Sequence, residues 1–124
     1  MNTSRIFFTV AASLGALGVI LGAFGAHALK SKLGVDQLAT FETGVRYQMY
    51  HVFALIAVAS LLARSPSSAA VASGWFFLAG IALFSGSLYL LALKSWTWLG
   101  PVTPLGGLCF IIGWITLAVA AARN

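Results

Sequence analysis

Four long apolar stretches, separated by short connectors, occupy most of this 124-residue sequence. They cover about residues 6–28, 47–63, 70–93 and 103–122. Hydrophobic residues make up 60% of the chain and charged residues only 7%, whereas about a quarter of the residues in a soluble domain are charged. A helix needs about 20 apolar residues to cross a bilayer. The sequence therefore predicts an all-α integral membrane protein, a four-helix bundle that forms a single transmembrane domain over residues 1–124.

The first stretch also has features of a cleavable secretory signal. Arg5 precedes it, and the small residues Ala26 and Ala28 flank His27 at its end. The apolar run of about 20 residues is longer than the 7 to 15 that form the core of a signal peptide. We therefore expect this stretch to remain as the first spanning helix.

A polar segment at residues 36–46 lies between the first two spans. It is predicted to form a short amphipathic helix at the membrane interface, which bends into the second span or continues as that span. Asp36 is expected to cap its N-terminus, because a carboxylate can accept bonds from the unpaired N–H groups of the first turn.

Polar side chains near the start of the second span are predicted to form one cluster where the first two helices meet the interface. Helical spacing places Glu42, Arg46 and Tyr50 together, and Tyr47 and His51 on the adjoining stripe. The predicted members are His27, Glu42, Arg46, Tyr47, Tyr50 and His51. Charged groups close to hydrocarbon need partners or access to the headgroups. Two interpretations are a charge-paired anchor and a binding site for a ligand, a lipid headgroup or a partner.

Small residues mark one face of the first helix. Gly15, Gly18, Gly22 and Gly25 recur at steps of three and four, and such stripes let membrane helices approach closely. The stripe is expected to pack against another helix of the same chain, with a seam between copies of the protein as the alternative.

The third span contains a second polar candidate, an intramembrane track formed by Ser85, Ser87 and Tyr89. A serine in a helix can donate to a carbonyl of the preceding turn. The alternative is a polar contact across the bundle.

The cations are scattered, although the formal net charge is +5. No basic stripe is present, so nucleic acid is not an expected partner. With four spans, three cations (Arg5, Arg64 and Arg123) share one membrane face, and four (Lys30, Lys32, Arg46 and Lys94) share the other. An excess of positive charge marks the cytoplasmic side of a membrane protein. Three cations against four is too even a distribution to choose an orientation.

Residues for catalysis or metal binding are scarce. One cysteine and two histidines do not make up the four nitrogen or sulfur ligands of a structural zinc site. No paired carboxylates, nucleophile with an adjacent base, or cofactor loop is recognisable. We therefore expect no metal, no cofactor and no catalytic residue.

Four sequence blocks carry a resemblance to a known family. They are GAFGAH at 22–27, TGVRYQMYH at 43–51, LFSGSLYLLAL at 83–93 and TPLGGLCFIIGW at 103–114. In these blocks the sequence resembles the bacterial inner-membrane family called domain of unknown function 423, whose eukaryotic counterpart is the small transmembrane protein 256. The resemblance covers nearly the whole chain. It implies a compact helical protein of the bacterial inner membrane and supplies no catalytic residues.

These observations together favour a non-enzymatic inner-membrane protein. The expected role is that of a structural or accessory subunit that binds membrane lipids, itself or a larger membrane complex. The alternative is a channel or transporter for a small solute, with the polar cluster as its mouth. A continuous wet cavity from Arg46 to Ser85 would favour the alternative, and a dry, filled bundle would favour the subunit.

Overall fold

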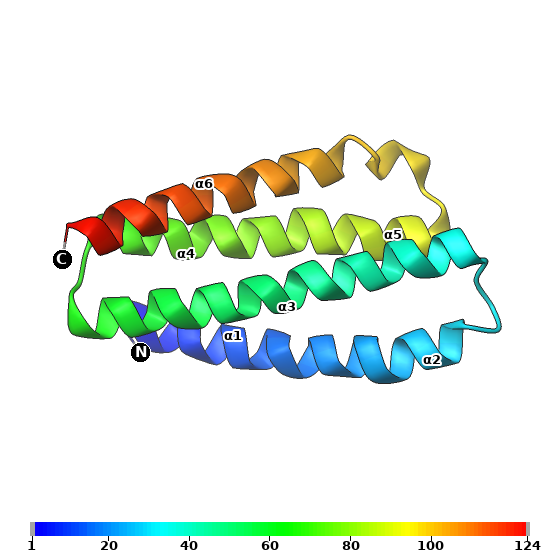
Figure 1. Ribbon diagram of the computed structural model, residues 1–124, viewed down its shortest axis with the longest axis horizontal. Helices are drawn as coiled ribbons and strands as arrows, with labels where there is room; N and C mark the ends of the chain where they lie inside the picture. Colours follow the sequence, from blue (N-terminus) through cyan, green and yellow to red (C-terminus); the bar gives the residue numbers. More distant parts are fainter. Residues whose placement is uncertain (1, 124) are drawn as a thin grey trace.

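Four antiparallel helical rods form the protein, as shown by a computed structural model that describes residues 2–123 (Figure 1). Met1 and Asn124, the ends of the predicted domain, lie outside the described residues. Each rod contains a helix that is long and apolar enough to cross a membrane. Within residues 2–123 the regular structure is helical, without strands. The predicted all-α architecture of a four-helix membrane protein is confirmed.

The first and third rods are each built from three helical segments in direct succession. The first comprises α1 (Thr3–Val19), the π-helical η1 (Ile20–Gly25) and α2 (Ala26–Leu29). The third comprises α4 (Ser68–Gly80), the π-helical η2 (Ile81–Ser85) and α5 (Gly86–Lys94). The second rod is α3 (Val35–Arg64), and the fourth contains the short 3₁₀ segment η3 (Thr97–Leu99) and α6 (Val102–Ala122).

Helix α3 includes the segment that was predicted to be a short interfacial helix, and of the two alternatives given for it the structure adopts continuation as the second span. Residues 36–46 are the first third of one continuous helix of 30 residues. At ~1.5 Å per residue, α3 is about 45 Å long and exceeds the roughly 30 Å of a hydrocarbon core. Its N-cap is Gly34, not Asp36, which lies in the first turn. The side chain of Gln37 accepts the Gly34 N–H at 3.2 Å, so one unpaired donor at this helix end is satisfied from within the first turn.

The rods are ordered α1, α3, α4–η2–α5 and α6, and this order is visible in Figure 1. Helix α3 packs against α1 on one side and against the third rod on the other, whereas α6 packs mainly against the third rod. Helices α3 and α6 touch each other little. This arrangement leaves space for a groove between them.

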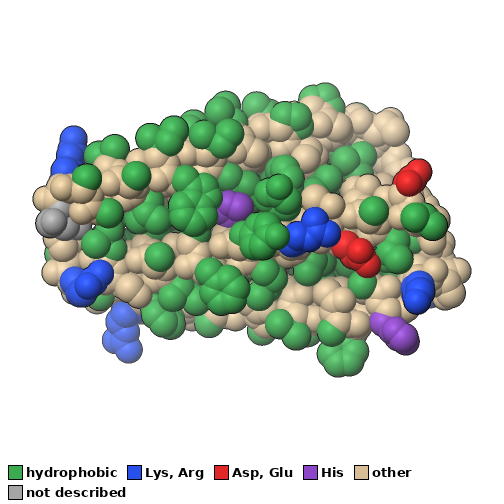
Figure 2. All heavy atoms as spheres, viewed as in Figure 1, with side chains coloured by type: hydrophobic (Ala, Val, Ile, Leu, Met, Phe, Trp, Pro, Cys, Tyr) green, Lys and Arg blue, Asp and Glu red, His purple; other side chains and the backbone are tan. Residues whose placement is uncertain are grey.

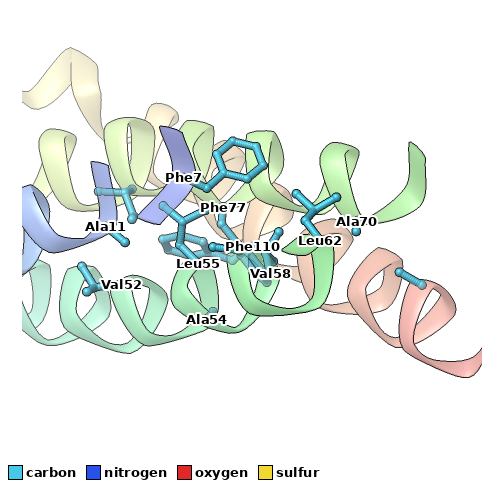
Figure 3. Packing of buried hydrophobic residues seen from close by; sticks show 13 residues of the cluster. Phe7, Ala11, Val52, Ala54, Leu55, Val58, Leu62, Ala70, Phe77 and Phe110 are labelled. Carbon is cyan, nitrogen blue, oxygen red and sulfur yellow. The ribbon is translucent and has the colours of Figure 1, made fainter. Parts of the chain in front are cut away.

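The apolar core lies between α3, α4 and α6, with α1 contributing at one end. Figure 3 shows Phe7, Leu55, Val58, Phe77 and Phe110 gathered there. Rings from neighbouring helices fit over glycines: a Cβ on Gly80 would collide with Phe110, and one on Gly113 would lie 2.8 Å from the Phe77 ring. Helices α4 and α6 therefore interlock by exchanging rings and glycines.

The glycine stripe of the first rod faces α3. A Cβ added to Gly18 would collide with the side chain of Met49, and one on Gly22 would lie 3.0 Å from Val45. A Cβ on Gly25 would lie 3.3 Å from the Phe41 ring, and one on Gly15 would make an ordinary contact with Val52 at 3.5 Å. The small residues thus let α3 approach the first rod closely within one chain.

Two adjacent glycines of α6 provide a matched test of this packing. A Cβ on Gly106 would collide with the backbone nitrogen of Phe84, which cannot rotate away, whereas one on Gly107 would meet the Phe84 ring at 3.9 Å, an ordinary contact. We expect Gly106→Ala to lower the free energy of unfolding by about 1–3 kcal/mol. Gly107→Ala should be neutral or slightly stabilising, because alanine favours a helix over glycine by roughly 0.5–1 kcal/mol. Denaturant unfolding in mixed micelles measures both, and equal effects would contradict the packing described here.

Candidate functional site

The side chain of Gln48 connects three helices at the polar centre of the bundle. It is 2% exposed. Its Nε2 donates to the Leu14 carbonyl of α1 at 2.8 Å, and its Oε1 accepts from the Tyr89 hydroxyl of α5 at 2.6 Å. Sequence reasoning missed this residue. The signal was present, since an amide within a spanning helix requires polar partners from neighbouring helices.

A second interhelical bond joins the third rod to α3. Ser85, fully buried at the end of η2, donates to the Gly44 carbonyl at 2.7 Å. The absence of a side chain on Gly44 permits this approach, because a Cβ there would lie 2.8 Å from the Tyr89 ring. Of the two alternatives for this serine, the structure adopts the contact across the bundle.

The other members of the predicted intramembrane track lie on different faces of α5. Ser87 shares a 2.6 Å hydrogen bond with the Thr103 hydroxyl of α6, and it also donates to the Phe84 carbonyl in its own rod at 2.9 Å. Tyr89 turns to Gln48 instead. The three residues are therefore divided between two neighbouring helices and do not form one line of polar groups.

Ser73 of α4 differs from these groups. Its hydroxyl is fully buried and has no hydrogen-bond partner among the described residues. The structure offers no physical reason for this hydroxyl.

The imidazole of His51 lies deep between α3 and α6, with 4% of the residue exposed. Its ring stacks on Phe110, with the centroids 3.5 Å apart and the planes 7° from parallel. Nδ1 lies 2.7 Å from the Tyr47 carbonyl, and Nε2 accepts the indole N–H of Trp114 at 3.1 Å. A carbonyl can only accept, so Nδ1 carries the hydrogen. One neutral tautomer thus satisfies both ring nitrogens.

An aromatic groove opens beside this imidazole, between α3, α6 and Phe84 of the third rod. Its volume is about 530 Å³, and its wall is mainly apolar. We call it the aromatic groove, and its lining residues are Tyr47, Tyr50, His51, Phe84, Gly107, Phe110, Ile111 and Trp114. Figure 2 shows an imidazole near the middle of this face, surrounded by hydrophobic side chains.

A shallower cavity of about 360 Å³ lies between α3 and the first rod. We call it the charged cavity, and its lining residues are Gly22, Glu42, Val45, Arg46, Met49 and Tyr50. Both charged side chains are exposed, and neither makes an ion pair or side-chain hydrogen bond with another residue of the described chain. Tyr50 lines both cavities, which therefore adjoin.

The single polar cluster predicted from the sequence is thus divided in the structure. Glu42, Arg46 and Tyr50 line the charged cavity, whereas Tyr47 and His51 line the aromatic groove with Tyr50. His27 is exposed on α2 and takes part in neither cavity. The Glu42–Arg46 ion pair expected at helical spacing is not formed. Helical spacing predicts which residues lie next to one another on α3. It does not predict which other helix each of their side chains will contact.

Metal ligands do not gather in the described part of the chain. Residues 2–123 contain no group of three histidine, cysteine, aspartate or glutamate side chains that could hold an ion. Both nitrogens of His51 already have partners. Cys109 is a free, half-buried thiol on α6.

Residues 21–107 match the family model described as "Protein of unknown function (DUF423)", which extends from η1 into α6 and includes Gln48, Ser85 and His51. The chain belongs to this family. It is similar to the UPF0382 membrane protein YwdK of Bacillus subtilis, with 45% identity over 96% of this chain and 98% of the relative. It is also similar to the UPF0382 inner membrane protein YgdD of Escherichia coli, with 40% identity over 98% of this chain and 92% of the relative.

The comparisons confirm the resemblance to the bacterial family seen in the sequence. These relatives are named as membrane or inner membrane proteins, and the chain has four helices that are able to span a membrane. This DUF423 protein is therefore a small multi-pass protein of the bacterial inner membrane. No solved structure matches the chain.

Two serines test the importance of the interhelical hydrogen bond. Ser85→Ala removes the bond to Gly44, and we expect it to lower the free energy of unfolding by about 0.6 kcal/mol and by no more than about 1.7 kcal/mol, the average and the maximum measured for hydrogen bonds between membrane helices. Ser73→Ala is the matched control, because it removes an equally buried hydroxyl without a partner and should not destabilise the protein. Unfolding in mixed micelles measures both. A Ser73→Ala variant that loses as much stability as Ser85→Ala would contradict this assignment.

Proposed function

We propose that this protein is a non-enzymatic accessory subunit of the bacterial inner membrane that works by binding membrane lipid, a second copy of itself or a larger membrane complex. The observation that carries the proposal is the internal pairing of the polar side chains inside the bundle; of the buried side-chain nitrogen and oxygen atoms in the described residues, only the Ser73 hydroxyl lacks a partner. Gln48, Ser85, Ser87, His51 and Tyr89 each bond to another part of the same chain. Such an interior holds the helices together and leaves the outer surface for binding.

The kinds of polar residue that are buried in the described chain also support this role. Among residues 2–123 the buried polar residues are serines, a glutamine and a histidine, and none is an acid, a lysine or an arginine. Proton and ion carriers use ionisable groups inside the membrane, histidine included, usually paired or facing a wet cavity, whereas both ring nitrogens of His51 are engaged by the Tyr47 carbonyl and the Trp114 indole. A bundle whose buried side chains are held in neutral hydrogen bonds is better suited to a structural role.

The outer surface offers large apolar areas for association. Exposed side chains of α6 include Leu105, Ile111 and Ile115, and those of the first rod and α3 include Phe24 and Phe53. In a membrane these residues contact lipid tails or the helices of other proteins. The glycine stripe of α1 is already covered by α3, so association with other chains would use these larger side chains.

The solute-carrier alternative receives little support from the same geometry. It requires a wet path from Arg46 to Ser85, but Arg46 lines a shallow outer cavity, whereas Ser85 is fully buried against Gly44. The names of the relatives contain no transport or enzyme activity, which fits a non-enzymatic subunit.

The proposal is tested by extraction of the full-length protein from its native membrane with a mild detergent. We expect specific lipids, a second copy or a defined membrane protein to copurify in constant ratio. An unrelated four-span membrane protein, purified in parallel, identifies molecules that follow any such chain. The same preparation in liposomes should show no solute flux above protein-free vesicles. Solute flux without any specific copurifying molecule would overturn the accessory role.

A further inference from the structure

We propose that the charged cavity and the aromatic groove together bind one phospholipid with a primary-amine head, chemically a phosphatidylethanolamine. Its phosphate would lie on Arg46, its ammonium on Glu42, and one acyl chain in the aromatic groove. This inference rests on the proposed accessory role and names the ligand for the surface of α3.

The depth of the two cavities along α3 fits a lipid in one leaflet. Arg46 lies 18 residues before Arg64, which ends the helix, and this spacing is about 27 Å at ~1.5 Å per residue. Because this spacing is close to the thickness of a hydrocarbon core, about 30 Å, the two arginines lie at the two opposite headgroup boundaries. Glu42 lies one turn farther out. His51 lies five residues farther in, about 7–8 Å below Arg46, at acyl-chain depth.

The charges of the outer cavity complement a zwitterionic head. Glu42 and Arg46 are one helical turn apart, a spacing that puts their Cβ atoms about 5–6 Å from each other. Both are exposed, and no ion pair within the described chain occupies either one. In an ethanolamine head a short ethylene link joins the ammonium to the phosphate. Arginine can bind the phosphate through two parallel N–H groups, and the carboxylate can accept from the ammonium.

The order of the charges also matches the direction of a lipid. The cation lies nearer the hydrocarbon and the acid lies farther out, as the phosphate and the amine do in a phospholipid of this type. The carboxylate of Glu42 would repel a headgroup that carries only negative charge. A choline head offers no N–H group to the carboxylate.

The aromatic groove provides the place for the chain. It adjoins the charged cavity at Tyr50 and extends toward Trp114 and Ile111 of α6. The two polar groups at its base, His51 and the Trp114 indole, bond to each other and so present no unpaired nitrogen to hydrocarbon. Figure 2 shows a basic and an acidic group close together on the same face, next to the hydrophobic side chains of the middle.

The test uses full-length protein in mild detergent, incubated with equal amounts of phosphatidylethanolamine, phosphatidylglycerol and phosphatidylcholine that share the same acyl chains. Native mass spectrometry then counts the bound lipids. We expect one retained phosphatidylethanolamine, preferred about tenfold over either competitor, as one charge-assisted hydrogen bond allows.

Exposed-charge variants locate the headgroup without disturbing the core. Arg46→Gln should reduce phosphatidylethanolamine binding about tenfold. Glu42→Gln should remove the preference over phosphatidylglycerol while phosphate binding remains. Lys94→Gln is the matched control, since it removes an exposed cation from the same end of the bundle and should change nothing. Gly107→Leu fills the groove and should also reduce binding, provided that its unfolding midpoint equals that of the wild type.

Equal retention of the three lipids by the wild type would overturn the lipid site, as would equal binding by Arg46→Gln and Lys94→Gln. If either result accompanies a stable dimer or a specific protein partner, the accessory role remains and the lipid inference alone falls. Solute flux through the protein without a specific partner would instead remove the accessory role on which the inference rests.

Discussion

The need to give buried polar groups a partner in a medium without water governs most of this structure, and the Ser73 hydroxyl is the exception. Within hydrocarbon an unsatisfied amide has no solvent to bond with. The side chain of Gln48 meets this requirement by bonding to the backbone of α1 and to Tyr89 of α5 at the same time. The register of three helices is thereby fixed at one point. The bond from Ser85 to Gly44, one turn away on α3, fixes the third rod again.

Close packing makes these bonds available. Gly44 has no side chain to keep the third rod away, and the glycine stripe of the first rod brings α1 within reach of Gln48. The π segments add one residue to the helical ladder, and η2 ends at Ser85, which faces α3. Small residues, irregular turns and buried hydrogen bonds therefore depend on one another. The two cavities lie at the edges of this packing, the charged cavity between α3 and the first rod and the aromatic groove between α3 and α6.

The sequence predicted the number, the type and the approximate positions of the spanning helices, because apolar length is a direct physical requirement of the bilayer. It left open whether the helix at residues 36–46 bends into the second span or continues as that span, since an amphipathic pattern suits both a short interfacial helix and the end of a long one. It also placed His27 and His51 together. Both were expected at the ends of spans on one membrane face, but α3 begins at Val35, so His51 lies in its middle, near the level of Gly15 and not of His27, and its ring turns toward α6.

Gln48 and Trp114 show the limit of reasoning from one helix at a time. Both lie in apolar stretches, and their importance comes from partners on other helices: Leu14 and Tyr89 for the glutamine, and His51 for the indole. Periodicity indicates which residues share a face. It contains no information on which neighbour that face will meet, and for that reason the predicted polar cluster divided into two cavities.

A double-mutant cycle on Gln48 and Tyr89 tests the central claim most directly. The cycle combines Gln48→Leu with Tyr89→Phe and measures the free energy of unfolding of all four proteins in mixed micelles. The structure predicts a coupling energy of about 0.6–1.7 kcal/mol, as found for other interhelical hydrogen bonds in membrane proteins. Strictly additive effects of the two substitutions would contradict the claim that this bond joins α3 to α5.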